Sequence, residues 1–470
     1  MAKFFIDHHG CAKNQTDGEV ITGFLAKAGY ELTYNPEQAD FILVNSCGFI
    51  ESAKKESINA IYNIKKSYPK AKIILTGCLA ERYAAELYES MPELDGIFGN
   101  GDLSKIAEYL EPLNKKKTSR LNYEKSPQKG ICSGERPYLF NFKASAFVKI
   151  TEGCSNFCSF CAIPLIRGTV RSRPLKSIIS EIKTLIKKGV YEINLIGQDL
   201  AAYTFGTEPD STSNLKDLLL AISELKGDFI VRTLYIHPDH FDTAILEVYK
   251  KDSRFVHYFD IPFQSGDNNI ILAMNRKGSS KKYIDLVKKI KKELPDAAIR
   301  TTFLTGFPGE TEEAAQNTRE FLQTIKPFWS GCFPFSREEG TAAWNMKNRV
   351  PKKIAKQRAD LLSQLQQELT LSQLKKYVSK ELDVLVEEIV ACEPGSEGLA
   401  IGRAWFNAPE VDGSVVIRFD PEEKEQFNAV KEGNVVKVKV IACTGIDLDS
   451  IFVSLVKKMP STDIKYLDEI

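Results

Sequence analysis

The sequence predicts a multidomain α/β protein whose three parts differ in the spacing of their strands. Strands and helices alternate from residue 3 onward, βα units recur from residue 146 over about 200 residues, and five short strands follow residue 380. Alternating strands and helices are typical of parallel sheets, whereas closely spaced strands are typical of small barrels. We therefore expect an N-terminal parallel α/β domain, a central complete or partial TIM-like (β/α) barrel, and a C-terminal small antiparallel β-barrel.

The N-terminal domain is predicted from three successive βα units. The expected elements are a strand at 3–6, a helix ending near Gly29, a strand at 41–44, a helix over about 52–68, a strand at 72–75 and a helix after Leu79. Residues 113–130 are basic, polar and aperiodic, as expected of an exposed linker. This composition change predicts a first domain of residues 1–125.

The other two domains are predicted from their strand patterns. Central strands are expected at VKI, YEINLIG, VRTLYIH, YFDIPF, AIRTTFLTG and GCFPF, with helical patterns between them. After a basic helical stretch at 352–377, the C-terminal strands are expected at ELDVLVEEIV, LAIGRAW, GSVVIRF, VVKVKVIAC and SIFVSLV. The predicted domains are 140–375 and 378–460.

Composition excludes some classes of protein. The 470 residues carry a net charge of +1, so the chain as a whole favours neither nucleic acid nor membrane. No apolar run approaches the roughly 20 residues of a membrane span, and the N-terminus does not resemble a signal peptide. We expect a cytoplasmic protein without a membrane partner, in which the ten cysteines are free thiols or ligands rather than disulfides.

The central cysteine motif, TEGCSNFCSFCAIP, follows directly on the first strand of the predicted barrel. Barrel active sites are built at this carboxyl edge. Cys154, Cys158 and Cys161 can bind three irons of a 4Fe-4S cube and leave the fourth iron open to S-adenosylmethionine (SAM). A zinc site usually needs a fourth ligand, and three buried thiols would rarely lie so close in one loop. The cluster is therefore favoured over both alternatives.

This motif resembles that of the radical SAM superfamily. The resemblance implies that SAM is cleaved to a 5′-deoxyadenosyl radical, which abstracts hydrogen. It also implies that Phe160 packs against the adenine, and that Gln198 and Asp199 contact the methionine part of SAM. The glycine turn FLTGFPGE would approach SAM closely through Gly306 and Gly309.

Three further cysteines occur just after the three predicted N-terminal strands. Cys11, Cys47 and Cys78 should converge, because the carboxyl ends of parallel strands share one edge of the sheet. The alternative is that small thiols merely suit tight βα loops. The equivalent placement of all three favours a second, auxiliary 4Fe-4S cluster, whose open iron could hold an exogenous sulfur species.

Together these features resemble the methylthiotransferase family, whose C-terminal barrel is the TRAM domain. One branch modifies an adenosine in tRNA, and the RimO branch modifies an aspartate of small-subunit ribosomal protein uS12. GCAKNQTDGE is similar to the GCxKNxxDSE start of the RimO branch, with Gly18 in place of the usual serine, whereas the tRNA enzymes have a GCQMN-like form. Other RimO-like phrases are FCAIPLIRG, YFDIPFQ, MNRKG, RTTFLTGFPGETEE, FSREEGTAAW and NAPEVDG.

The RimO-like phrases imply a reaction at the aspartate β-carbon, with one SAM as methyl donor and another as radical source. No general acid or base is assigned, because that hydrogen is essentially non-acidic. The implied partners are uS12, free or in the ribosomal subunit, a reductant and a sulfur donor. The alternatives kept open are a tRNA adenosine methylthiotransferase and a non-catalytic iron–sulfur, RNA-binding scaffold.

Local charge agrees with a basic protein partner. Residues 380–470 contain ten Lys or Arg and eighteen Asp or Glu, a net charge of −8, although RNA-binding surfaces are normally basic. These carboxylates could equally be a solvated face. The basic linker and residues 352–358 could still contact ribosomal RNA.

Several residues have two interpretations. His8, His9, His237 and His240 lie near the cysteines or at a strand end, and each could be functional or simply solvated. The arginines after the central motif could bind carboxylates or lie in solvent; they are Arg167, Arg171 and Arg173. Four cysteines without ligand spacing are interpreted as structural; they are Cys132, Cys332, Cys392 and Cys443.

Overall fold

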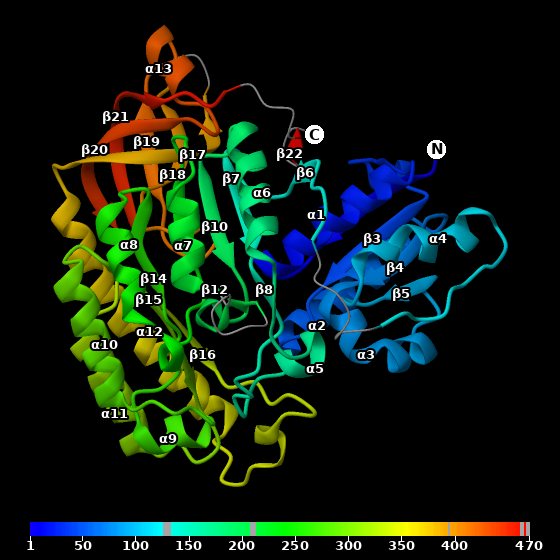
Figure 1. The fold of residues 1–470 in the computed structure, drawn as a ribbon, viewed down its shortest axis with the longest axis horizontal. Helices are drawn as coiled ribbons and strands as arrows, with labels where there is room; N and C mark the ends of the chain where they lie inside the picture. Colours follow the sequence, from blue (N-terminus) through cyan, green and yellow to red (C-terminus); the bar gives the residue numbers. More distant parts are fainter. Residues whose placement is uncertain (126–132, 207–212, 393–394, 461–464, 467–470) are drawn as a thin grey trace.

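The computed structural model describes residues 1–125, 133–206, 213–392, 395–460 and 465–466. The protein has three parts (Figure 1). The N-terminal part, in blue and cyan, lies beside the central part in green and yellow, and the C-terminal part, in orange and red, covers one end of the central part. Among the described residues, no helix is both long enough and apolar enough to cross a membrane.

The N-terminal part is a five-stranded, all-parallel sheet in the order β2-β1-β3-β4-β5. Its strands are β1 (Lys3–His8), β2 (Glu31–Leu32), β3 (Phe41–Ser46), β4 (Lys72–Thr76) and β5 (Gly96–Phe98). Its helices are α1 (Ala12–Lys27), α2 (Glu51–Ser67), α3 (Gly77–Ser90) and α4 (Ile106–Asn114). Every residue of β3 is buried, as expected when helices cover both faces of a parallel sheet. The predicted order of strands and helices is confirmed.

The central part is an open, parallel sheet of six strands in the order β16-β15-β14-β13-β10-β7. The strands are β7 (Ser145–Lys149), β10 (Glu192–Ile196), β13 (Ile230–Thr233), β14 (Phe255–Asp260), β15 (Ala298–Thr305) and β16 (Trp329–Pro334). A complete TIM barrel has eight strands, so the partial form of the predicted barrel is the one observed. The sheet remains open between its two edge strands, β7 and β16.

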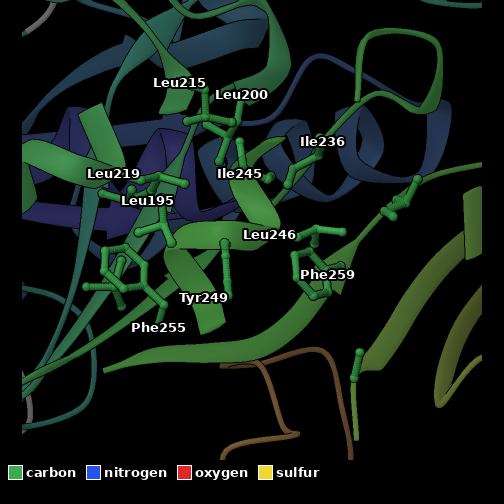
Figure 2. Packing of buried hydrophobic residues seen from close by; sticks show 14 of the residues in the cluster. Leu195, Leu200, Leu215, Leu219, Ile236, Ile245, Leu246, Tyr249, Phe255 and Phe259 are labelled. Carbon is green, nitrogen blue, oxygen red and sulfur yellow. The ribbon is translucent and has the colours of Figure 1, made fainter. Parts of the chain in front are cut away.

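Helices cover the outer face of this sheet. The helices of the central part are α5 (Ile163–Arg167), α6 (Leu175–Lys187), α7 (Leu215–Ser223), α8 (Leu246–Lys251), α9 (Asn268–Ala273), α10 (Ser280–Glu293), α11 (Glu312–Ile325) and α12 (Lys352–Leu374). Of these, α5 packs against α3 of the N-terminal part. Figure 2 shows Leu195 and Phe259 of the sheet beside Leu219 of α7 and Tyr249 of α8, all of them buried. Burial of each such side chain stabilises the fold by about 1.5–3 kcal/mol.

The C-terminal part is a closed barrel of five strands in the order β17-β18-β19-β21-β20. The strands are β17 (Glu381–Ala391), β18 (Gly398–Arg403), β19 (Val415–Phe419), β20 (Val435–Thr444) and β21 (Asp447–Lys457). The barrel is not wholly antiparallel, because β19 and β21 pair in parallel. Closure places β21 between β19 and β20. Because β21 runs antiparallel to β20, it runs parallel to β19 on its other side.

Both outer parts contact the central part through specific elements. Helix α1 packs on β7, the first strand of the central sheet. On the other side, Trp329 at the start of β16 donates a hydrogen bond from Nε1 to the backbone oxygen of Phe406, at 2.6 Å. Near the C-terminus, β22 (Lys465–Tyr466) pairs with β6 (Tyr138–Leu139), so the end of the chain returns to the entry of the central part.

Candidate metal centres

The central cysteine loop lies between two short paired strands that follow β7. Strand β8 (Thr151–Glu152) pairs with β9 (Arg171–Ser172), which closes the loop at its base. Cys154 donates its backbone N–H to the oxygen of Gly168 at 3.1 Å. Gly153 has a φ of +75°, and a Cβ there would lie 2.2 Å from the oxygen of Thr169. Only glycine therefore fits the position directly before the first cysteine.

The middle of the loop is fixed by backbone contacts. Cys161 donates its N–H to the oxygen of Cys158 at 2.9 Å. Ser159, between them, donates its N–H to the oxygen of Met274 and accepts the N–H of Ala343, at 3.1 and 2.7 Å. The hydroxyl of Ser159 donates to the oxygen of Ala273 at 2.8 Å. The loop is thus held before any ligand binds, as a preorganised site requires.

The three thiols of this loop affect one another. Burial, together with the charge of a thiolate at Cys158, raises the pKa of Cys154 to about 11 and that of Cys161 to about 12. Three thiolates in one half-buried loop therefore need a positive partner, which bound iron would supply. Among the described residues, no three His, Cys, Asp or Glu side chains gather closely enough to hold a single metal ion. The assignment of these cysteines to a 4Fe-4S cluster stays a prediction.

Asp199 connects the end of β10 to the cysteine loop. Its buried carboxylate accepts the side-chain amide N–H of Asn156 at 2.9 Å and the backbone N–H of His237 at 3.1 Å. His240 Nδ1 lies 3.4 Å from the same carboxylate. Burial raises the pKa of Asp199, but the hydrogen bonds from His240 and Asn156 outweigh that effect and lower it. Asp199 supports the loop, and its direct contact with SAM stays a prediction.

Gln198 carries the clearest sign of a missing ligand. Both polar atoms of its side-chain amide are buried, and neither has a hydrogen-bond partner among the residues that the structure describes. Buried amides are normally satisfied, so an unpartnered one indicates a ligand that completes its hydrogen bonds. This observation fits the expected contact with the polar methionine part of SAM.

A cavity of about 780 Å³ opens beside the loop, between the central and N-terminal parts. Phe160 and Gly306 line it, together with residues 49–52 of the N-terminal part, whereas Gln198, Asp199 and Gly309 do not. Its volume suits a ligand the size of SAM. A Cβ on Gly306 would lie 2.2 Å from that of Ala355, so this glycine also lets α12 pack closely. Gly309 has open space and a φ of +88°.

The three N-terminal cysteines lie at the carboxyl ends of three neighbouring strands, β1, β3 and β4. Cys11 precedes α1, Cys47 follows β3, and Cys78 lies in the first turn of α3. A Cβ on Gly48 would lie 2.6 Å from the backbone oxygen of Cys78. The Cys78 thiol donates to Oδ1 of Asn14, three residues after Cys11, at 3.1 Å. The structure thus brings these cysteines to one edge of the sheet.

A buried arginine of the central part reaches this second group. Arg167, at the end of α5, has its Nη2 at 3.4 Å from the Cys78 sulfur. Its guanidinium also pairs with Asp17 of α1 at 2.9 Å and with Glu152 at 2.6 Å, and Lys149 pairs with both carboxylates. All of these charged side chains are buried. One ionic network therefore joins the N-terminal cysteines to the strand that leads into the central cysteine loop.

Charge and burial act differently on the three N-terminal thiols. Burial raises the pKa of Cys47 to about 12 and also raises that of Cys78, although Arg167 opposes the second shift. Desolvation also acts on Cys11, but the positive charges of Lys13 and Arg167 outweigh it and lower the pKa of that thiol. Positive charge is thus already placed beside thiols that a metal would bind as thiolates.

The structure shows the surroundings of the arginines and histidines that had two interpretations. Arg167 and Arg173 are buried, so neither lies in solvent; Arg173 pairs with Glu181 at 2.6 Å. Arg171 donates to the backbone oxygens of Arg167 and Thr169. His237 Nε2 lies 3.9 Å from the Cys158 sulfur. The N-terminal histidines are held by neighbours, His8 by the side chain of Asn45 and His9 by Asp7 and Glu56.

The sequence did not indicate the roles of some residues in this region. Nothing in the sequence pairs Arg167 with a cysteine 89 positions earlier, or Asn14 with Cys78. Lys13 lies in the GCAKN phrase, yet its position against the ring of Tyr235 depends on how the domains meet. Of the four cysteines interpreted as structural, three are half-buried and Cys132 lies outside the described residues.

Models of three families match the chain. They are the uncharacterized protein family UPF0004 over residues 3–99, the radical SAM superfamily over residues 148–322, and the TRAM domain over residues 378–453.

Curated relatives align along nearly the whole chain. The ribosomal protein uS12 methylthiotransferase RimO of Treponema denticola is 50% identical over 95% of this chain and 100% of its own. The protein of the same name from Carboxydothermus hydrogenoformans is 38% identical over 96% of this chain and 100% of its own. The RimO of Thermotoga maritima is 38% identical over 87% and 92%.

Among solved structures, the radical S-adenosylmethionine methyltransferase TsrM from Kitasatospora setae is similar in fold. The form with tryptophan substrate and a SAM analogue has a TM-score of 0.53 and 14% identity, and covers 71% of this chain and 72% of that chain. The form with cobalamin and a [4Fe-4S] cluster has a TM-score of 0.52, 14% identity, and coverage of 73% and 74%. At such identity the likeness concerns the fold alone.

Proposed function

Because this chain belongs to the RimO family of radical SAM methylthiotransferases, we propose that it attaches a methylthio group to an aspartate of ribosomal protein uS12. The reacting atom is the β-carbon of that aspartate. The observation that carries the proposal is the buried network of Arg167, which links the N-terminal cysteine group to the strand before the central one, in a chain that aligns with curated RimO proteins along nearly its full length.

Membership of the radical SAM superfamily implies one 4Fe-4S cluster and SAM. Cys154, Cys158 and Cys161 are the proposed ligands of that cluster, and the proposed second cluster binds through the N-terminal cysteines Cys11, Cys47 and Cys78. When bound, the first cluster supplies the electron for radical formation from SAM, and the second carries the sulfur that is transferred. The proposed domains are 1–125, 140–375 and 378–460.

The protein's own residues position SAM. Phe160 lines the cavity, where it offers an apolar surface for the adenine. Gln198 has a free donor and a free acceptor for the polar end of SAM. Gly306 exposes backbone to the cavity and, like Gly309, has a positive φ. Asp199 keeps Asn156 of the cysteine loop in place.

The C-terminal barrel is the proposed contact for the basic substrate protein, but its acidic surface is smaller than its composition indicates. The side chains of Glu387 and Asp412 are buried, and they pair with Arg403 and Arg300. Only the exposed carboxylates can attract a partner, and they act mainly on the rate of association. A ribosomal substrate also predicts that the enzyme works in the cytoplasm with a reductant and a sulfur donor.

Within residues 352–358, the proposed contact with ribosomal RNA narrows to the first turn of α12, and the basic linker stays a second candidate. Arg358 is buried and pairs with Glu310 at 2.8 Å, so it cannot reach a phosphate. The side chain of Lys352 is 94% exposed. A phosphate contact would therefore involve the first turn of this helix.

The test is an anaerobic reaction of the reconstituted enzyme with SAM, sulfide and a reductant. Purified uS12, the small ribosomal subunit and unmodified tRNA are offered in parallel, and products are identified by mass spectrometry. We expect one methylthio group on a uS12 aspartate and none on tRNA. Modified tRNA with unmodified uS12 would favour the tRNA methylthiotransferase instead, and formation of no 5′-deoxyadenosine would favour a non-catalytic protein.

A further inference from the structure

Lys13 is a half-buried cation beside the N-terminal cysteines. It lies in the first turn of α1, two residues after Cys11. Its Nζ is 3.1 Å from the centre of the Tyr235 ring, which belongs to the central part. This lysine therefore crosses the boundary between the domain that holds one cysteine group and the domain that holds the other.

Tyr235 and His237 link the two cysteine groups. Tyr235 follows the end of β13 in a left-handed conformation, with φ +68°, which is rare for an aromatic residue. His237, two residues later, lies 3.9 Å from the Cys158 sulfur. The charge of Lys13 also acts on the Cys11 thiol, so the ammonium lies near the N-terminal cysteine group as well as against a residue that precedes His237.

The charge of Lys13 has no anionic partner within the described parts of the chain. No carboxylate oxygen there lies within 4.0 Å of its Nζ, and no side-chain hydrogen bond forms. The neighbouring carboxylates serve other cations: Asp17 and Glu152 pair with Lys149 and Arg167, and Asp260 with Arg300. A half-buried ammonium is usually paired, and an aromatic face compensates it only in part.

We propose that Lys13 binds the carboxylate of the substrate aspartate. The inference rests on the function proposed above and extends it to the residue that selects an acidic side chain. A charge-assisted hydrogen bond from the ammonium would hold the carboxylate beside the N-terminal cysteines. The β-carbon is one bond from that carboxylate, so it would lie between the two cysteine groups.

The test compares two peptides that carry the target aspartate of uS12 or asparagine in its place. Fluorescence anisotropy gives the affinity of each labelled peptide for the reconstituted enzyme with SAM but without reductant. Wild-type enzyme should prefer the aspartate peptide by about tenfold to a hundredfold, the usual range for one hydrogen bond to a charged group. Lys13→Met should abolish the preference, and Lys13→Arg should keep most of it.

A matched control uses another lysine that lies over a tyrosine ring. Lys457 has its Nζ 4.5 Å from the centre of the Tyr191 ring, at the junction with the C-terminal barrel. Lys457→Met should leave the aspartate preference unchanged. Iron content and thermal unfolding of the Lys13 variants show whether the fold and both clusters persist.

Two results would overturn the role of Lys13. One is equal binding of both peptides by the wild type, and the other is a preference that survives Lys13→Met in folded protein. Failure of the proposed function looks different, because wild-type enzyme with reductant would then cleave SAM without modifying the aspartate peptide. The binding ratio decides the role of Lys13 in either case.

Discussion

The two cysteine groups of this protein are built in opposite ways. Cys154, Cys158 and Cys161 lie within eight consecutive residues, and hydrogen bonds of the loop and the central part hold them. Cys11, Cys47 and Cys78 come from three strands spread over 68 residues, and the parallel sheet alone brings them together. A site encoded in one loop depends on local turns, whereas a site at a sheet edge depends on the whole domain.

The groups also differ in their dependence on a neighbouring domain. The N-terminal group receives the guanidinium of Arg167 from the central part, through a buried network. A second buried network joins the central part to the C-terminal barrel, where Glu192 pairs with Arg403 at 2.6 Å and with Arg232 at 3.1 Å. That network reaches no cysteine among the described residues. It is therefore an internal control for effects of buried charge alone.

The largest effect is expected from Cys158→Ala. The variant should lose all formation of 5′-deoxyadenosine and bind about four irons instead of the about eight expected for two cubes. The remaining iron would belong to the N-terminal site, which is assembled separately. Anaerobic iron and sulfide counting with a chromatographic assay of SAM cleavage measures both. Retention of SAM cleavage would contradict the assignment of the central loop.

Cys47→Ala should remove the N-terminal cluster and leave the central cluster in place. We expect a loss of about four irons and of all methylthiolated product, while SAM cleavage persists, because the central loop keeps its own contacts. Cys443→Ala, at the end of β20, is the control and should keep the full iron content. Equal iron in the Cys47 variant and the wild type would show that the N-terminal cysteines hold no cluster.

Arg167→Met and Arg403→Met should cost similar stability but differ at the N-terminal site. Each removes one partner of a buried network, which typically destabilises a protein by about 3–5 kcal/mol. Only the loss of Arg167 removes positive charge beside Cys78, so only this variant should lower the reduction potential of the N-terminal cluster.

The potential is best measured in the Cys158→Ala background, where the N-terminal cluster is the one that remains. A redox titration followed by electron paramagnetic resonance gives its value, and denaturant unfolding gives the loss of stability. An equal change of potential in the Arg403 variant would contradict the direct effect of Arg167. Arg167→Lys keeps the charge and should move the potential less than Arg167→Met does.

The smallest expected effect concerns the buried network of Glu192, Arg403 and Arg232, which reaches no cysteine among the described residues. Burial raises the pKa of Glu192, but the charges of Arg403 and Arg232 outweigh burial and hold this pKa far below its usual value. Its stabilising contribution is therefore complete above the unfolded pKa, about 4.3, and is lost as the pH falls below that value. The difference in melting temperature between wild type and Glu192→Gln should be constant from about pH 7 to 5 and shrink below about pH 4. A difference that already shrinks between pH 7 and 5 would contradict this assignment.

Much of the fold could be predicted because its signals are local. The strand at 72–75 and the helix over about 52–68 follow short-range patterns of apolar residues, and the structure places β4 and α2 there. The parallel pair of β19 and β21 could not be predicted, because it depends on which strand closes the barrel. The convergence of Cys11, Cys47 and Cys78 was predictable from topology, since parallel strands end at one edge.

The sequence by itself determined the central cysteine group and the three-part fold, because ligand spacing and apolar periodicity are properties of neighbouring residues. It indicated the N-terminal group through the order of the parallel strands. Only the tertiary structure decided that Arg167 lies against Cys78, that Lys13 lies over Tyr235, and that Gln198 has no partner for its amide. The two contacts join residues from different domains. These contacts depend on how the domains pack and on the charges that this packing buries. No short-range sequence pattern encodes that packing.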